Sequence, residues 1–132
     1  MKKLLLLASI IGFSFAVNVT VVAKNVDDIA EIFVDGRKVA ECQWNYQNCN
    51  TGKTLDLQGK HEIRFRLTNL VYRGPCLFGP CGKFSGDFAV AVNNKIIWSD
   101  SIYVRDNSEG VKYDKILICN FKDSKSYCIE KN

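Results

Sequence analysis

The six cysteines are the residues of this chain that could take part in the most kinds of chemistry, from disulfide formation to metal binding. They fall into three pairs of near neighbours, with six, four and eight residues between the members: Cys42 and Cys49, Cys76 and Cys81, Cys119 and Cys128. Zinc sites use closely spaced ligands such as Cys-x-x-Cys, often with histidine, whereas these intervals are longer and the chain holds one histidine. Tight loops and hairpins bring Cα atoms within the ~7 Å that a disulfide requires. The spacing therefore predicts three local disulfides, which form in oxidising compartments.

The first sixteen residues have the pattern of a secretion signal. Lys2 and Lys3 precede an apolar run from Leu4 to Phe13, and Ser14-Phe15-Ala16 supplies a small-x-small cleavage site. The run is too short to span a bilayer, and no later segment approaches the ~20 apolar residues of a spanning helix. We expect residues 17–132 to form a single secreted or periplasmic domain with no membrane span.

Other reactive groups are scarce. His61 is the single histidine, and no nucleophile elbow, histidine pair for a metal, or phosphate-binding glycine loop is present. Paired carboxylates can hydrolyse glycosides, and the candidates are Asp27 with Asp28 and Asp100 with Asp106. Aspartate is also a common turn residue, so these acids are better explained as parts of bends. The sequence therefore favours a protein that is not an enzyme.

One polar bend has the composition of a weak calcium site. Asn25, Asp27 and Asp28 offer side-chain oxygens close together in sequence. Calcium needs about six oxygen ligands, and the local sequence supplies only these. A solvated turn is the favoured interpretation. We expect no cofactor, with a structural calcium ion as the alternative.

Aromatic residues give the best signal for binding. Sugars stack on aromatic planes while neighbouring amides and carboxylates hold their hydroxyl groups. Trp44, Tyr46 and Asn48 bring such groups together in the loop between Cys42 and Cys49. The alternative for Trp44 is a place at the edge of the core, so Tyr46 is the better exposed candidate. The loop indicates a surface glycan as the ligand.

A second loop repeats Gly-Pro-Cys, at Gly74 and again at Gly79. Glycine, proline and a disulfide would give residues 74–82 a fixed irregular shape that presents apolar residues to a partner protein. The contact candidates here are Tyr72, Arg73, Leu77 and Phe78. The alternative is that Phe78 folds back into the core.

Charge excludes one class of partner. The formal net charge is +4, of which Lys2 and Lys3 supply two, and basic and acidic residues are interleaved along the rest of the chain. Nucleic-acid-binding domains concentrate their basic residues in a stripe or a recognition motif, and this chain has neither. We expect no nucleic-acid partner.

Alternation of apolar and polar residues predicts a mostly β structure. His61 to Thr68 and Phe84 to Val92 alternate cleanly, which indicates strands with one face in a core and one in water. Asp35-Gly36 predicts a two-residue hairpin turn. The stretch Val26 to Glu31 is the one short candidate for a helix. About nine short strands separated by turn residues are typical of an antiparallel β-sandwich or barrel. The ten segments from which we expect these strands are Val17–Val22, Ile29–Asp35, Arg37–Trp44, Thr54–Leu57, His61–Thr68, Phe84–Val92, Lys95–Trp98, Ser101–Arg105, Lys115–Asn120 and Ser126–Glu130.

A family resemblance supports the sandwich. The segments concerned are residues 23–28, residues 32–39, Trp44, residues 55–66, Asn69 and residues 86–88, which together span about half the chain. They resemble the galactose-binding-like superfamily of jelly-roll β-sandwiches, in which an acidic bend, an Asn/Asp-Gly turn and a Trp precede a strand of the form Leu-x-x-Gly-x-His/Asn-x-Ile. The resemblance implies a glycan-binding module, with structural calcium in many members. The cysteines and the insertion at residues 74–82 depart from the family pattern.

The combined expectation is a disulfide-linked β-sandwich that acts by binding, with a surface glycan as the first choice of ligand. The alternative is a filament subunit or a secreted inhibitor or effector. That alternative rests on the loop at residues 74–82 and on an N-terminal strand, Val17–Val22, that pairs with the exposed edge of a neighbour.

Overall fold

The computed structural model of the chain describes residues 15–44, 49–71 and 82–131. These residues form nine strands and one short 3-10 turn, η1 (Asp123–Lys125). The strands are β1 (Val17–Asp27), β2 (Ile29–Val34), β3 (Arg37–Gln43), β4 (Cys49–Leu57), β5 (Gly59–Asn69), β6 (Phe84–Val92), β7 (Lys95–Val104), β8 (Gly110–Phe121) and β9 (Tyr127–Glu130).

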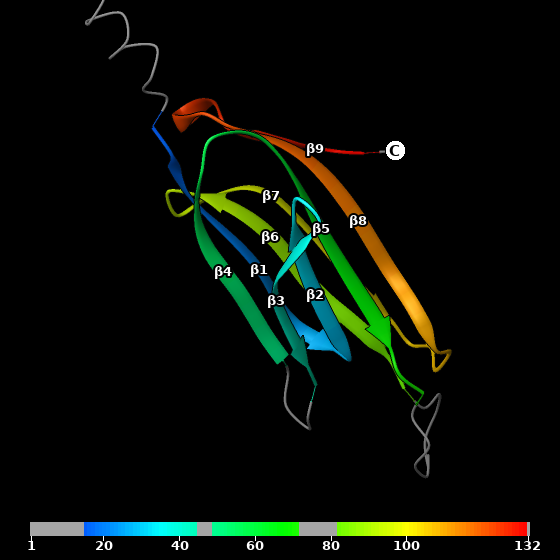
Figure 1. The fold of residues 1–132 in the computed structure, drawn as a ribbon. Coiled ribbons are helices and arrows are strands. Elements are labelled where there is room, and N and C mark those ends of the chain that lie inside the picture. The colour runs from blue at the N-terminus through cyan, green and yellow to red at the C-terminus, as the bar shows by residue number, and fades with distance from the viewer. Residues whose placement is uncertain (1–14, 45–48, 72–81, 132) are drawn as a thin grey trace, which may run out of the picture.

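The strands make two antiparallel sheets that lie face to face (Figure 1). The four-stranded sheet has the order β4-β1-β6-β7, and the five-stranded sheet has the order β3-β2-β5-β8-β9. The predicted all-β antiparallel sandwich is therefore confirmed. The chain changes sheet after β1, β3, β4, β5 and β7, so most strand pairs join residues far apart in sequence.

The core lies between the sheets and is built from alternate residues of each strand. Ile63, Phe65 and Leu67 of β5 and Phe88 of β6 are almost completely buried, as the alternation predicted. The ring of Phe65 lies 5.4 Å from that of Phe88 and 5.5 Å from that of Trp98, measured between ring centres. Burying one such side chain stabilises the fold by about 1.5–3 kcal/mol, so this aromatic cluster is a main link between the sheets.

Two hairpins are fixed by residues that tolerate positive φ. Asp35 and Gly36 have φ of 51° and 80° between β2 and β3, and Asn93 and Asn94 have φ of 50° and 68° between β6 and β7. Left-handed backbone at both central positions matches the twist of the flanking strands. The predicted Asp35-Gly36 turn is confirmed.

Three local expectations are wrong. Val26–Glu31 is not helical: it ends β1 and begins β2, because Val26 and Ala30 are buried in the strand pattern while the chain passes between sheets. The two strands expected in residues 95–105 are one continuous strand, β7. The N-terminal strand β1 has no free edge, since it is paired with β4 on one side and β6 on the other.

Two of the three predicted disulfides are confirmed. Cys119 and Cys128 face each other on the neighbouring strands β8 and β9, with Cα atoms 4.0 Å apart. Cys42 and Cys49 have Cα atoms 5.8 Å apart and join β3 of one sheet to β4 of the other. This disulfide therefore ties the sheets together along one side of the sandwich. The pair Cys76 and Cys81 lies outside the described residues.

Helices that are long and apolar enough to cross a bilayer are absent from residues 15–44, 49–71 and 82–131. The disulfides are compatible with an extracytoplasmic protein.

Candidate functional site

Most binding residues predicted from the two loops cannot be placed. Tyr46, Asn48, Tyr72, Arg73, Leu77 and Phe78 lie outside the described residues. Trp44 follows β3 and is half-buried, and its backbone N–H donates a 2.6 Å hydrogen bond to the carbonyl oxygen of Asp28. Trp44 therefore helps to position the connection between β1 and β2.

The three calcium candidates are engaged with other protein groups, and Asp27 and Asp28 are hydrogen-bonded to each other. Asn25 donates from Nδ2 to Oδ2 of Asp87 at 2.7 Å, and Asp28 accepts the backbone N–H of Leu70 on Oδ2 at 2.7 Å. Asp27 is only 8% exposed. In the described part of the chain, no three histidine, cysteine or acidic side chains lie close enough together to hold a metal ion.

Burial gives Asp27 an unusual carboxyl group. Removal from water, a hydrogen bond with Asp28 and the negative charge of Asp28 raise the pKa of Asp27 to about 7, while the positive charge of Lys83 lowers it. A carboxyl group in these surroundings holds its proton near neutral pH because its charged form is poorly solvated. Asp27 thus changes charge in the neutral range, at the crossing from one sheet to the other.

A bulge in β1 places Asn25 on the outer face of the four-stranded sheet. The pairing of β1 shifts register against both β4 and β6 around Lys24 to Val26, and Asn25 has a φ of 54°. The backbone N–H of Asn25 donates to Asn50 Oδ1 at 2.9 Å, and its carbonyl oxygen accepts from Ser85 Oγ at 3.1 Å. Bulges often direct a side chain toward a site in this way.

Beside Asn25 lies a hollow of about 440 Å³ in the outer face of the four-stranded sheet, which we call the β6–β7 hollow. Ser85 of β6 is opposite Tyr103 of β7, and Asp87 is opposite Ser101. These four side chains point away from the core because their neighbours Phe84 and Phe88 point into it. The full lining is Asn25, Lys83, Ser85, Gly86, Asp87, Ser101, Ile102 and Tyr103.

Tyr103 is the aromatic wall of the β6–β7 hollow. It is 60% exposed, and Lys83 Nζ lies 5.7 Å from the centre of its ring. Lys83 has no carboxylate within ion-pair distance among the described residues. The hollow therefore combines an exposed ring, an ammonium group, a carboxylate held by an amide, and two hydroxyl groups. These groups suit a polar ligand with an apolar face.

His61 has a structural position rather than an open one. Its Nδ1 lies 2.6 Å from Asp35 Oδ2 and its Nε2 lies 2.9 Å from the carbonyl oxygen of Gln58. Desolvation opposes ionisation of Asp35, but hydrogen bonds from His61 and from the N–H of Glu62 outweigh it and lower the pKa of this carboxyl. One ring nitrogen thus contacts the turn between β2 and β3, and the other contacts the turn between β4 and β5.

The carboxylates considered for glycoside hydrolysis are also engaged. Asp100 accepts the hydroxyl hydrogen of Tyr113 at 2.8 Å, and Asp106 accepts the N–H of Ser108 at 3.0 Å and its hydroxyl at 2.6 Å. Asp106 therefore shapes the loop between β7 and β8, as expected of an aspartate in a bend.

Sequence reasoning did not find the β6–β7 hollow. Its residues stand at outward positions of two alternating strands, and those positions were treated as ordinary wet surface. The signal present in the sequence was the tyrosine at 103, an aromatic residue on the polar side of its strand.

Comparison of the chain with known protein families, with curated proteins and with solved structures found no match.

Proposed function

We propose that the protein is a secreted or periplasmic, non-enzymatic binding module, and that the β6–β7 hollow receives a sugar residue of a surface glycan. The observation that carries the proposal is the exposed ring of Tyr103 beside hydrogen-bonding groups on Asn25, Ser85, Asp87 and Ser101. One face of a sugar ring is apolar and its rim carries hydroxyl groups, so this arrangement complements it.

Rigid positioning supports the same proposal. Asn25 is held by Asn50, Ser85 and Asp87, so the polar rim of the hollow is already ordered before a ligand arrives. A site that is ordered in advance loses less entropy on binding. The predicted leader and the disulfides favour a location outside the cytoplasm, where glycans are exposed.

Glycan arrays and affinity electrophoresis in polysaccharide gels test the proposal on the mature protein. We expect Tyr103→Ala to weaken binding about tenfold or more, because stacking area and aromatic contacts are lost. Tyr127→Ala is the matched control, since Tyr127 is also an exposed tyrosine (51%) but belongs to β9 of the other sheet. Equal binding by both variants, or no binding of any glycan by the parent protein, would contradict the proposal.

A third variant separates the hollow from the loop predicted from the sequence. If the glycan binds in the loop at residues 45–48, Tyr46→Ala will abolish binding and Tyr103→Ala will not. The β6–β7 hollow predicts the reverse.

A second candidate function, a structural or interaction subunit, has one observation in its favour. In the described part of the chain the backbone of β7 forms a strand ladder only with β6, and β7 carries the exposed apolar residues Ile96, Tyr103 and Val104. An open strand edge can accept a strand from a partner. Light scattering discriminates the two: growth of the particle with concentration favours assembly through β7, and a constant monomer counts against it.

A further inference from the structure

The outer face of the five-stranded sheet carries a second hollow, of about 300 Å³, which we call the Arg66 hollow. It is on the opposite side of the sandwich from the β6–β7 hollow. Its lining is Phe33, Gly36, Lys38, Glu62, Arg64 and Arg66. Three cationic side chains thus meet one acidic side chain around an aromatic ring, which is an unusual wall for a small polar surface.

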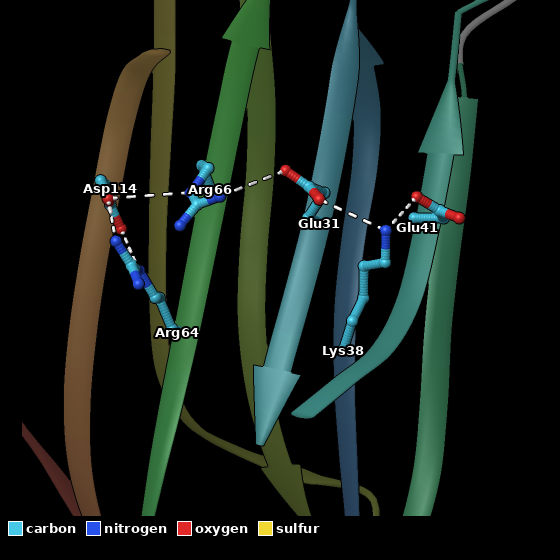
Figure 2. A network of polar contacts seen from close by, with 6 residues as sticks. All are labelled: Glu31, Lys38, Glu41, Arg64, Arg66 and Asp114. Atoms are coloured by element: carbon cyan, nitrogen blue, oxygen red, sulfur yellow. Dashed lines mark hydrogen bonds and ion pairs between the residues drawn. The ribbon is translucent and has the colours of Figure 1, made fainter. Parts of the chain in front are cut away.

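Strand register creates the charged surroundings of this hollow. Glu41 lies opposite Glu31, Glu31 opposite Arg66, and Arg66 opposite Asp114, so these residues form a row across β3, β2, β5 and β8. Figure 2 shows this row with Lys38 and Arg64 beside it. Lys38 and Arg64 form ion pairs with acids of the row. The strand register therefore determines which charges of the row are neutralised.

Two of the three cations have close acidic partners. Arg64 donates from Nε to Asp114 Oδ1 at 2.7 Å and from Nη2 to Oδ2 at 2.5 Å (Figure 2). Lys38 Nζ lies 2.7 Å from Glu41 and 3.4 Å from Glu31. The hydrogen bonds with these acids raise the pKa of both Lys38 and Arg64. Glu31 and Asp114 therefore have nearer partners than Arg66.

Arg66 is the cation whose hydrogen-bonding capacity remains open. Its Nη1 lies 3.7 Å from Glu31 and its Nε lies 3.8 Å from Asp114, both beyond hydrogen-bonding distance. Nε is buried and has no acceptor among the described residues. The guanidinium carbon lies over the Phe33 ring, 5.0 Å from its centre.

We propose that the Arg66 hollow binds an oxyanion, a carboxylate or sulfate group, through the guanidinium of Arg66 with Lys38 beside it. A planar guanidinium matches the two oxygens of such a group, and the contact with the Phe33 ring restricts where the guanidinium can lie before the anion arrives. Glu62 shares the wall, and Glu31, Glu41 and Asp114 lie beside the three cations, so these four acids oppose the anion and we expect binding in the millimolar range only. This site goes beyond the proposed glycan function and does not depend on it.

The probe is sulfate, added to the mature protein at constant ionic strength by replacing chloride. NMR follows the Nε–Hε signal of Arg66, and we expect a saturable shift with sulfate, a weaker one with acetate and none with chloride. Calorimetry measures sulfate binding by the variants. Arg66→Gln should remove saturable binding, and Arg66→Lys should weaken it several-fold because lysine lacks the two-pronged guanidinium group. A shift of equal size with chloride, or unchanged binding by Arg66→Gln, would overturn the proposal.

Matched controls separate this site from bulk charge and from the other hollow. Lys53→Gln makes the same change of net charge at an exposed lysine of the four-stranded sheet and should leave sulfate binding intact. Loss of binding in Lys53→Gln would show that only total charge matters. Tyr103→Ala should also leave it intact, so failure of the glycan proposal and failure of the oxyanion proposal give different results.

Sulfated and unsulfated forms of one oligosaccharide then identify the source of the anion. Tighter binding of the sulfated form than of free sulfate, lost in Arg66→Gln, assigns the site to a glycan substituent. Equal affinity assigns it to a free small anion.

Discussion

The two long sides of the sandwich hold the sheets together by different means. On one side, the disulfide between Cys42 and Cys49 joins β3 to β4. On the other side, β7 meets β8 through polar groups: Tyr113 donates to Asp100, and Lys115, which lies 2.6 Å from Glu130 of β9 within its own sheet, is 3.8 Å from Asp100. Reduction breaks the covalent link, whereas substitution of a polar residue or added salt weakens the polar contacts.

The difference also concerns the candidate site. The β6–β7 hollow includes β7, the strand held at its open edge by the polar contacts, and excludes β3 and β4. Tyr113 stacks on Phe88 with ring centres 4.7 Å apart, so it links β8 directly to the strand beneath the hollow. We therefore expect the disulfide side to control stability most and the polar side to control the shape of the hollow most.

Removal of the inter-sheet disulfide should have the largest effect. Cys42→Ala with Cys49→Ala should lower the free energy of unfolding by about 2–3 kcal/mol, because the unfolded chain regains the entropy of a short loop. Denaturant unfolding measures the loss. Hydrogen exchange should rise in β3 and β4, whereas Cys119→Ala with Cys128→Ala should raise it mainly in β9. The same exchange pattern in both variants would argue against a special role for the inter-sheet link.

A change of pH should have the second largest effect on the free energy of unfolding, through Asp27. Asp27 has a pKa of about 7 in the fold against 3.8 for the free side chain, so the folded state binds this proton more tightly. That stabilisation is complete below pH 3.8 and is lost as pH rises through 7. Between pH 5 and 8 it should decrease on the order of 2 kcal/mol. Asp27→Asn should flatten this dependence in urea unfolding curves, and an unchanged slope would show that Asp27 ionises normally.

Tyr113→Phe should have a smaller effect on stability and a specific one on the hollow. The variant loses the hydrogen bond to Asp100 but keeps the stack on Phe88, so we expect a loss of about 1 kcal/mol. Burial, the hydrogen bond and the negative charges of Asp100 and Glu130 all raise the pKa of Tyr113, so its hydroxyl stays a donor. Exchange rates in β7 should rise. Faster exchange in β4 instead would reverse our assignment of the two sides.

Lys115→Gln should have the smallest effect. Its hydrogen bond with Glu130 raises the pKa of Lys115, but the pair is partly exposed and salt screens it. We expect a loss of about 0.5 kcal/mol, and less in 1 M salt. Thermal unfolding at two salt concentrations measures it. A loss of unfolding free energy as large as that of the disulfide variant would contradict our expectation that the disulfide side contributes more to stability than the polar side.

Local patterns in the sequence were sufficient for several features of the fold. The alternation in β5 and β6 correctly assigned Phe65, Leu67 and Phe88 to the core. Asp35-Gly36 specified its turn because few residues adopt positive φ at low cost. Cysteine spacing specified the Cys42–Cys49 and Cys119–Cys128 pairs because a short loop leaves few alternatives.

Only the tertiary structure decided which strands are neighbours. Periodicity tells on which face of a strand a side chain lies, but not which strand lies beside it, since pairing is set by contacts between distant segments. For this reason β1, which was expected to pair with the exposed edge of a neighbour, lies inside its own sheet, and the disulfide of Cys42, which was expected to close a loop, also joins two sheets. Asn25 of β1, Asp87 of β6 and Tyr103 of β7 meet at one hollow for the same reason. The sequence determined the strands, the turns and the inward faces. The packing of distant strands determined the surfaces they share.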